Sequence, residues 1–63
     1  MSSKPNVNFY WQYVKSEYPD AVFSFWYPTG ELHFFPDKAA EDRGDDEWGC
    51  IKVDGEYKIV KEF

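Results

Sequence analysis

The amino-acid sequence predicts an α+β fold: an N-terminal helix packed on a four-stranded antiparallel sheet made of two hairpins. Apolar residues recur at helical spacing near the N-terminus, and two later segments, 21–36 and 48–62, each place a turn signal between strand-forming residues. The 63 residues suffice for a single domain, 1–63, and leave no room for a second. A small SH3-like β-barrel with a displaced helix is the alternative.

The first predicted element is a helix that ends at Tyr18. Its apolar side chains share one helical face, and the side-chain oxygen of Asn6 or Asn8 is the candidate N-cap. Pro19 ends the helix because the residue before a proline is biased away from helical dihedral angles. The predicted buried stripe consists of Val7, Tyr10, Trp11, Val14 and Tyr18.

The segment 21–36 is predicted to form the first hairpin. Tyr27-Pro28-Thr29-Gly30 fits a type I turn with glycine in the left-handed position, which gives a three-residue loop. A two-residue loop at Thr29-Gly30 is disfavoured because threonine resists a positive φ. The preferred register pairs Tyr27 with Glu31, Phe25 with His33 and Phe23 with Phe35.

Apolar side chains occupy both faces of this hairpin. In the preferred register Phe23, Phe25, Tyr27, His33 and Phe35 share one face, and Val22, Ser24, Trp26, Leu32 and Phe34 share the other. A single helix covers only one face of a sheet. We therefore expect Trp26 and one of Phe34 or Phe35 to stay partly exposed in a monomer, and an apolar patch of this kind marks an interaction site.

Residues 37–44 are predicted to form one or two helical turns, with Asp37 as N-cap and Gly44 as the left-handed stop. An acid-rich loop is the alternative for this segment.

The segment 48–62 is predicted to form the second hairpin, with two candidate registers. Asp54-Gly55 suits a two-residue turn. A three-residue loop from Val53 to Gly55 would instead pair Ile51 with Tyr57, and Lys52 with Glu56. Because that loop keeps the odd-numbered apolar residues on one face, we favour it and leave the two-residue turn open.

Charge is concentrated in one part of the chain. The net charge is −5, and residues 37–49 contribute six acids against two bases, or −4. An acidic chain is unsuited to bind nucleic acid directly or an anionic membrane surface. No apolar run is long enough to span a bilayer, and the polar N-terminus lacks the apolar core of a secretory signal. With one cysteine, these features lead us to expect a cytoplasmic protein.

Three motifs point weakly to specific chemistry. Cys50 and His33 are a conceivable nucleophilic pair, but a domain of this size has little room for a cleft and a third group. Asp42, Asp45, Asp46 and Glu47 are suitable ligand types for Ca²⁺, yet their spacing lacks the pattern of a calcium loop. Arg43-Gly44-Asp45 matches an integrin-recognition tripeptide that arises easily by chance. We therefore expect no enzyme, metal site or cofactor.

Residues 37–49, which we call the acidic stretch, are the leading candidate for the functional part of the chain. We expect a small non-enzymatic protein-binding module, an inhibitor or adaptor, that docks a basic surface of another protein. If the carboxylates are spaced like phosphates, that surface is a nucleic-acid-binding groove. In size, charge and aromatic content the chain is similar to small acidic inhibitors encoded by phages and mobile elements. The candidate partner-binding residues are Asp37, Glu41, Asp42, Asp45, Asp46, Glu47, Trp48 and Trp26.

Two other interpretations stay open. The chain is alternatively a self-associating structural module that forms a homodimer through an exposed aromatic sheet face. The acids would then serve only to keep an aromatic-rich protein in solution.

Overall fold

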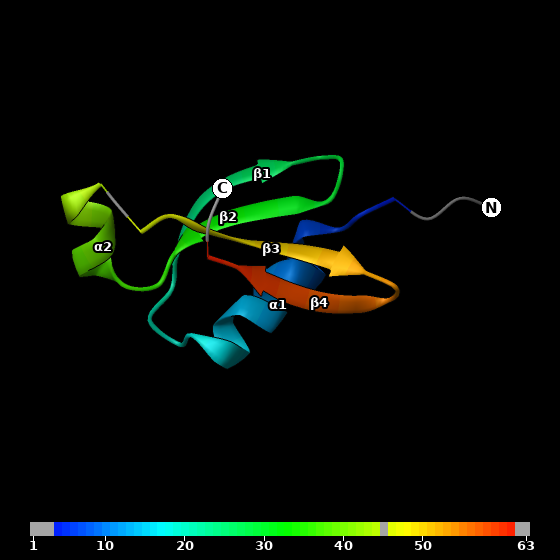
Figure 1. Ribbon diagram of the computed structural model, residues 1–63, viewed down its shortest axis with the longest axis horizontal. Helices are drawn as coiled ribbons and strands as arrows, with labels where there is room; N and C mark the ends of the chain where they lie inside the picture. The colour runs from blue at the N-terminus through cyan, green and yellow to red at the C-terminus, as the bar shows by residue number, and fades with distance from the viewer. Residues whose placement is uncertain (1–3, 45, 62–63) are drawn as a thin grey trace.

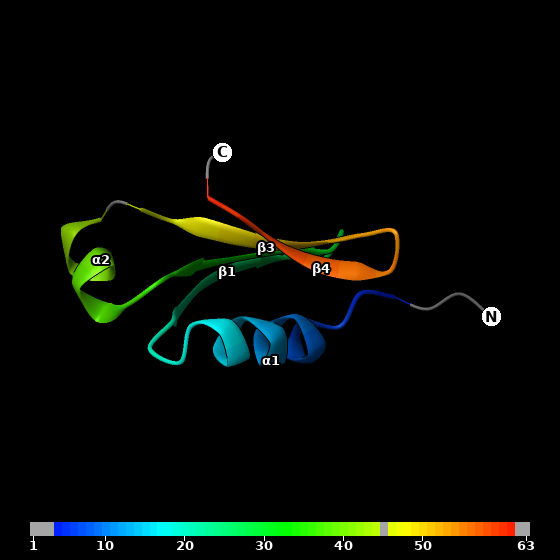
Figure 2. The same cartoon turned by 60° about the horizontal axis from the view of Figure 1, so that its bottom comes forward.

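The computed structural model describes residues 4–44 and 46–61. Its elements are α1 (Val7–Glu17), β1 (Val22–Tyr27), β2 (Glu31–Phe35), α2 (Lys38–Arg43), β3 (Trp48–Val53) and β4 (Glu56–Val60). The four strands form one antiparallel sheet in the order β1-β2-β3-β4 (Figure 1). Helix α1 covers one face of this sheet, and α2 lies beyond one end of it (Figure 2). The predicted α+β fold is confirmed, and the open sheet replaces the alternative barrel.

Helix α1 follows the sequence prediction closely. Asn6 is the N-cap, and its side-chain oxygen accepts a hydrogen bond from the backbone N–H of Asn8 at 2.9 Å. The helix ends at Glu17, and the next residue, Tyr18, donates its N–H to the carbonyl oxygen of Val14 at 2.7 Å. Tyr10 and Val14 are buried against the sheet, so the apolar stripe is confirmed.

The core lies between α1 and the sheet and is held by aromatic contacts. The Tyr10 ring packs edge-on against Trp26 at 5.1 Å and against Tyr57 at 4.9 Å between ring centroids. Such pairs add to the free energy that burial of the rings supplies. The buried cluster consists of Tyr10, Val14, Ala21, Leu32, Phe34 and Cys50.

The first hairpin has the predicted turn but a partly wrong predicted register. The N–H of Gly30 donates to the carbonyl of Tyr27 at 2.9 Å, and Phe25 lies opposite His33 as expected. A β-bulge then shifts the pairing, and Phe23 lies opposite Phe34 instead of the predicted Phe35. The extra residue in a bulge reverses which face the following side chains occupy.

The bulge changes the surroundings of Phe23. Instead of sharing a face with Phe25, the Phe23 ring packs edge-on against Trp11 of α1, with 5.7 Å between the ring centroids. The first residues of β1 therefore contribute to the contact between helix and sheet.

The second hairpin contradicts the three-residue loop that we favoured. Val53 pairs with Glu56 and Lys52 with Tyr57, which leaves Asp54-Gly55 as a two-residue turn. Both turn residues have positive φ, 52° at Asp54 and 81° at Gly55. This turn twists in the same sense as the strands, and aspartate followed by glycine tolerates its dihedral angles.

The two-residue turn divides the apolar residues of this hairpin between the faces of the sheet. Tyr57 and Ile59 pack against the core on the α1 side. Ile51 and Val53 alternate with the buried Cys50 and therefore point to the opposite face.

Residues 37–44 form the predicted helical turns. The Asp37 carboxylate accepts a hydrogen bond from the N–H of Ala40 at 2.8 Å, and Ala40 is fully buried. Gly44 ends α2 with a φ of 74°. Within residues 4–44 and 46–61, neither helix has the length and apolar character needed to cross a lipid bilayer.

Candidate functional site

The face of the sheet opposite α1 has no covering layer among the described residues (Figure 2). It displays Phe25, Tyr27 and Val53, which are 54%, 44% and 38% exposed. The rings of Phe25 and Tyr27 contact each other edge-on, with centroids 4.7 Å apart. We call this surface the open face; its exposed apolar side chains are the kind that mark an interaction site.

A polar cluster lies beside these aromatic rings. The His33 ring packs edge-on against Tyr27 at 5.0 Å, and its Nε2 lies 2.5 Å from Glu31 Oε2. Glu47 Oε2 accepts a hydrogen bond from the Ser24 hydroxyl at 2.5 Å and lies 3.8 Å from His33 Nδ1. Glu47 belongs to the acidic stretch, so these contacts join that stretch to the open face.

The other described acids of the stretch serve local roles in and around α2. Glu41 and Asp42 both contact the Lys38 ammonium, at 2.7 Å and 3.5 Å. The hydrogen bond that the Lys38 ammonium donates to Glu41, together with the charges of both carboxylates, raises the pKa of Lys38. Asp46 pairs with Arg43 at 3.2 Å. These groups are largely exposed, so the ion pairs add little to stability.

The eight candidate binding residues do not form one surface. Asp37, Glu41 and Asp42 lie in and before α2, while Asp46 and Glu47 lie between α2 and β3. Asp45 lies outside the described residues.

The two candidate tryptophans lie on the α1 side of the sheet. Trp26 packs against Tyr10, and Trp48 packs against Tyr18 with 5.3 Å between ring centroids. Trp26 and Phe35 are each half-buried and Phe34 is fully buried. Trp26 is therefore partly exposed as expected, but on the helix-covered side, so neither tryptophan joins Phe25 and Tyr27.

Sequence reasoning did not single out Phe25 and Tyr27. The sequence held no signal that separates the two faces, since each predicted face carries a polar residue, His33 on one and Ser24 on the other.

Cys50 and His33 lie on opposite faces of the sheet and do not form a nucleophilic pair. Cys50 is fully buried on the α1 side, whereas His33 contacts Tyr27 on the open face. Burial raises the pKa of the Cys50 thiol to about 11, so the thiol is protonated at neutral pH. In the described part of the chain, no three His, Cys, Asp or Glu side chains gather as metal ligands.

The thiol of Cys50 is expected to be unreactive in the folded protein. At neutral pH, 5,5′-dithiobis(2-nitrobenzoate) should react about a hundredfold more slowly without urea than in denaturing urea, because the thiol is buried and protonated. The released thionitrobenzoate is followed by absorbance, with Cys50→Ala as the blank. Equal rates in the two conditions would show that the thiol is accessible.

Comparison with known proteins finds no matching family model, curated protein or solved structure. The functional argument therefore rests on the surface chemistry of this chain.

Proposed function

We propose that this protein is a non-enzymatic protein-binding module, an inhibitor or adaptor, that docks its open face on another protein. The partner surface has an apolar centre and a basic margin. The observation that supports this proposal is the position of Glu47, whose contacts with Ser24 and His33 place a carboxylate beside the exposed Phe25 and Tyr27.

The aromatic pair supplies the apolar part of the proposed interface. Phe25 and Tyr27 are exposed and already pack against each other, so their rings need little further ordering on binding. Aromatic side chains that become buried at the centre of an interface carry much of the binding free energy.

The carboxylates supply the orientation and the choice of partner. The net charge of −5, with −4 in residues 37–49, favours encounter with a positively charged surface and disfavours nucleic acid itself. A groove that binds nucleic acid on the partner is also positively charged. In the inhibitory form of the proposal, this protein blocks such a groove.

Affinity capture with paired variants tests the proposal. Phe25→Ser should weaken binding of the captured partner about tenfold or more by removing an aromatic anchor. Glu47→Lys should weaken it mainly by slowing association, and added salt should do the same. The matched controls Phe9→Ser and Glu17→Lys alter an exposed aromatic and an exposed acid on α1, and both should bind normally.

Two results would contradict the proposal. One is equal capture by all four variants, and the other is capture that survives high salt and Glu47→Lys. Circular dichroism of each variant is the control for folding. Each variant should keep the spectrum of the folded protein, because both target side chains lie on the surface.

A homodimer through the open face is the second candidate, favoured by the exposed Phe25, Tyr27 and Val53. Two copies that each carry a charge of −5 repel each other, so this dimer requires screening by salt. Sedimentation over an about hundredfold concentration range distinguishes the candidates. A salt-favoured dimer that Phe25→Ser abolishes supports self-association, whereas a strict monomer supports a different partner.

A further inference from the structure

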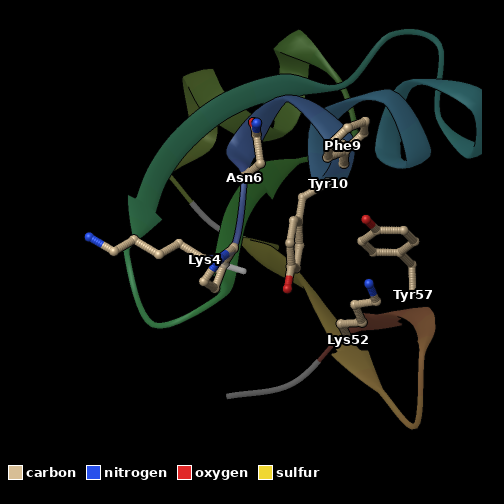
Figure 3. A pocket seen from close by; sticks show the side chains of 7 residues that line it. Lys4, Asn6, Phe9, Tyr10, Lys52 and Tyr57 are labelled. Atoms are coloured by element: carbon tan, nitrogen blue, oxygen red, sulfur yellow. The ribbon is translucent and has the colours of Figure 1, made fainter. Parts of the chain in front are cut away.

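A pocket of about 390 Å³ lies on the α1 side of the sheet. The segment before α1, the start of α1 and the β3–β4 hairpin form its walls (Figure 3). The start of α1 and this hairpin lie at the end of the molecule remote from α2 (Figure 1). The pocket volume falls within the range of pockets that hold small organic molecules. The open face lies on the other side of the sheet, so the pocket is separate from the proposed protein-binding surface.

The Tyr10 hydroxyl is an unpaired polar group inside this pocket. Tyr10 is only 5% exposed, and Trp26 and Tyr57 hold its ring in place. Figure 3 shows the hydroxyl at the free end of the ring, pointing into the space between the N-terminal segment and Lys52. Among the described residues none hydrogen-bonds to it. No buried side-chain oxygen or nitrogen of the described residues lacks a partner, so this hydroxyl oxygen reaches solvent at the pocket although its ring is buried. A hydroxyl in this position is free to donate to a bound ligand or to water.

The pocket is basic although the protein is acidic. Lys4 and Lys52 line it, and its described lining includes no aspartate or glutamate. The whole chain has twelve acidic residues and seven lysines and arginines. The Lys52 ammonium lies 5.4 Å from the centre of the Tyr57 ring, a cation–π distance that keeps it at the pocket wall.

The pocket also has an apolar part. Phe9 is 57% exposed and lines the pocket together with Tyr57 (Figure 3). An exposed phenylalanine beside two lysines and an unpaired hydroxyl provides both an apolar contact and polar groups that converge on one space.

We infer that this pocket binds a small organic carboxylate. The apolar body of the ligand lies against Phe9 and Tyr57, and its carboxylate accepts a hydrogen bond from the Tyr10 hydroxyl and pairs with the Lys52 ammonium. Burial, with a contribution from Tyr57, raises the pKa of Tyr10, so the hydroxyl retains its proton as a donor at neutral pH.

Titration of the full chain with 3-phenylpropionate, followed by amide NMR shifts, tests the inference. Saturable shifts should gather at the pocket residues, and the uncharged 3-phenylpropanamide should bind about tenfold more weakly, because hydrogen bonds to charged groups are the stronger ones. Lys52→Met and Tyr10→Phe should each weaken carboxylate binding about tenfold for the same reason.

Lys58→Met is the matched control, because Lys58 pairs with Ile51 in the same hairpin and points to the open face. Its affinity for 3-phenylpropionate should be unchanged. The inference is overturned by an absence of saturable shifts, by equal affinity for the acid and the amide, or by full affinity in Lys52→Met. Lys52 is exposed, so this last variant stays informative if Tyr10→Phe is poorly folded.

Discussion

Replacing Phe34 with alanine is expected to remove most of the stability of this protein. Among the residues that the structure describes, Phe34 is the largest fully buried side chain, and it contacts Tyr18 and Trp48 with ring centroids 5.8 Å and 6.1 Å away. A buried Phe→Ala change costs about 3–5 kcal/mol of unfolding free energy. A chain of this size has only about 3–9 kcal/mol in total.

Phe25→Ala is the matched control for this prediction. Phe25 lies on the neighbouring strand β1, but its ring is 54% exposed on the open face. Its removal should change the unfolding free energy by about 1 kcal/mol or less. Urea denaturation followed by circular dichroism measures both values. Equal losses in the two variants would mean that the open face is covered in solution.

Gly30→Ala is expected to give the second largest loss of stability. Gly30 has a φ of 112°, which side chains rarely adopt, and an added Cβ would lie 3.1 Å from Tyr10 Oη and 3.3 Å from Pro5 Cγ. The backbone strain and the crowding together should cost about 1–3 kcal/mol.

Gly55→Ala separates the two causes. Gly55 also has a positive φ, 81°, but an added Cβ would meet no atom within 4 Å. This control should therefore show only the conformational cost, about 1 kcal/mol. Urea denaturation of the two variants gives the difference. If Gly55→Ala proves as destabilising as Gly30→Ala, crowding against Tyr10 at the first turn contributes nothing to the loss of unfolding free energy.

The amino-acid sequence by itself determined the elements that depend on neighbouring residues. The Asn6 and Asp37 caps, the helix end near Pro19 and the Gly30 turn each follow from dihedral preferences or hydrogen bonds within about four residues along the chain. Local charge counting likewise located the acidic stretch. It did not locate its contacts, because the Glu47–Ser24 bond joins residues 23 positions apart.

Only the tertiary structure decided the registers and the faces. In the second hairpin, the count of apolar residues favoured a longer loop, whereas the Asp54-Gly55 turn was formed and left Ile51 and Val53 on the open face. In the first, a bulge gave Phe23 a contact with Trp11. Both faces of the first hairpin were apolar, so strand periodicity could not choose between them. Helix α1 makes that choice by covering Trp26 with Tyr10, and Phe25 and Tyr27 are left on the uncovered side.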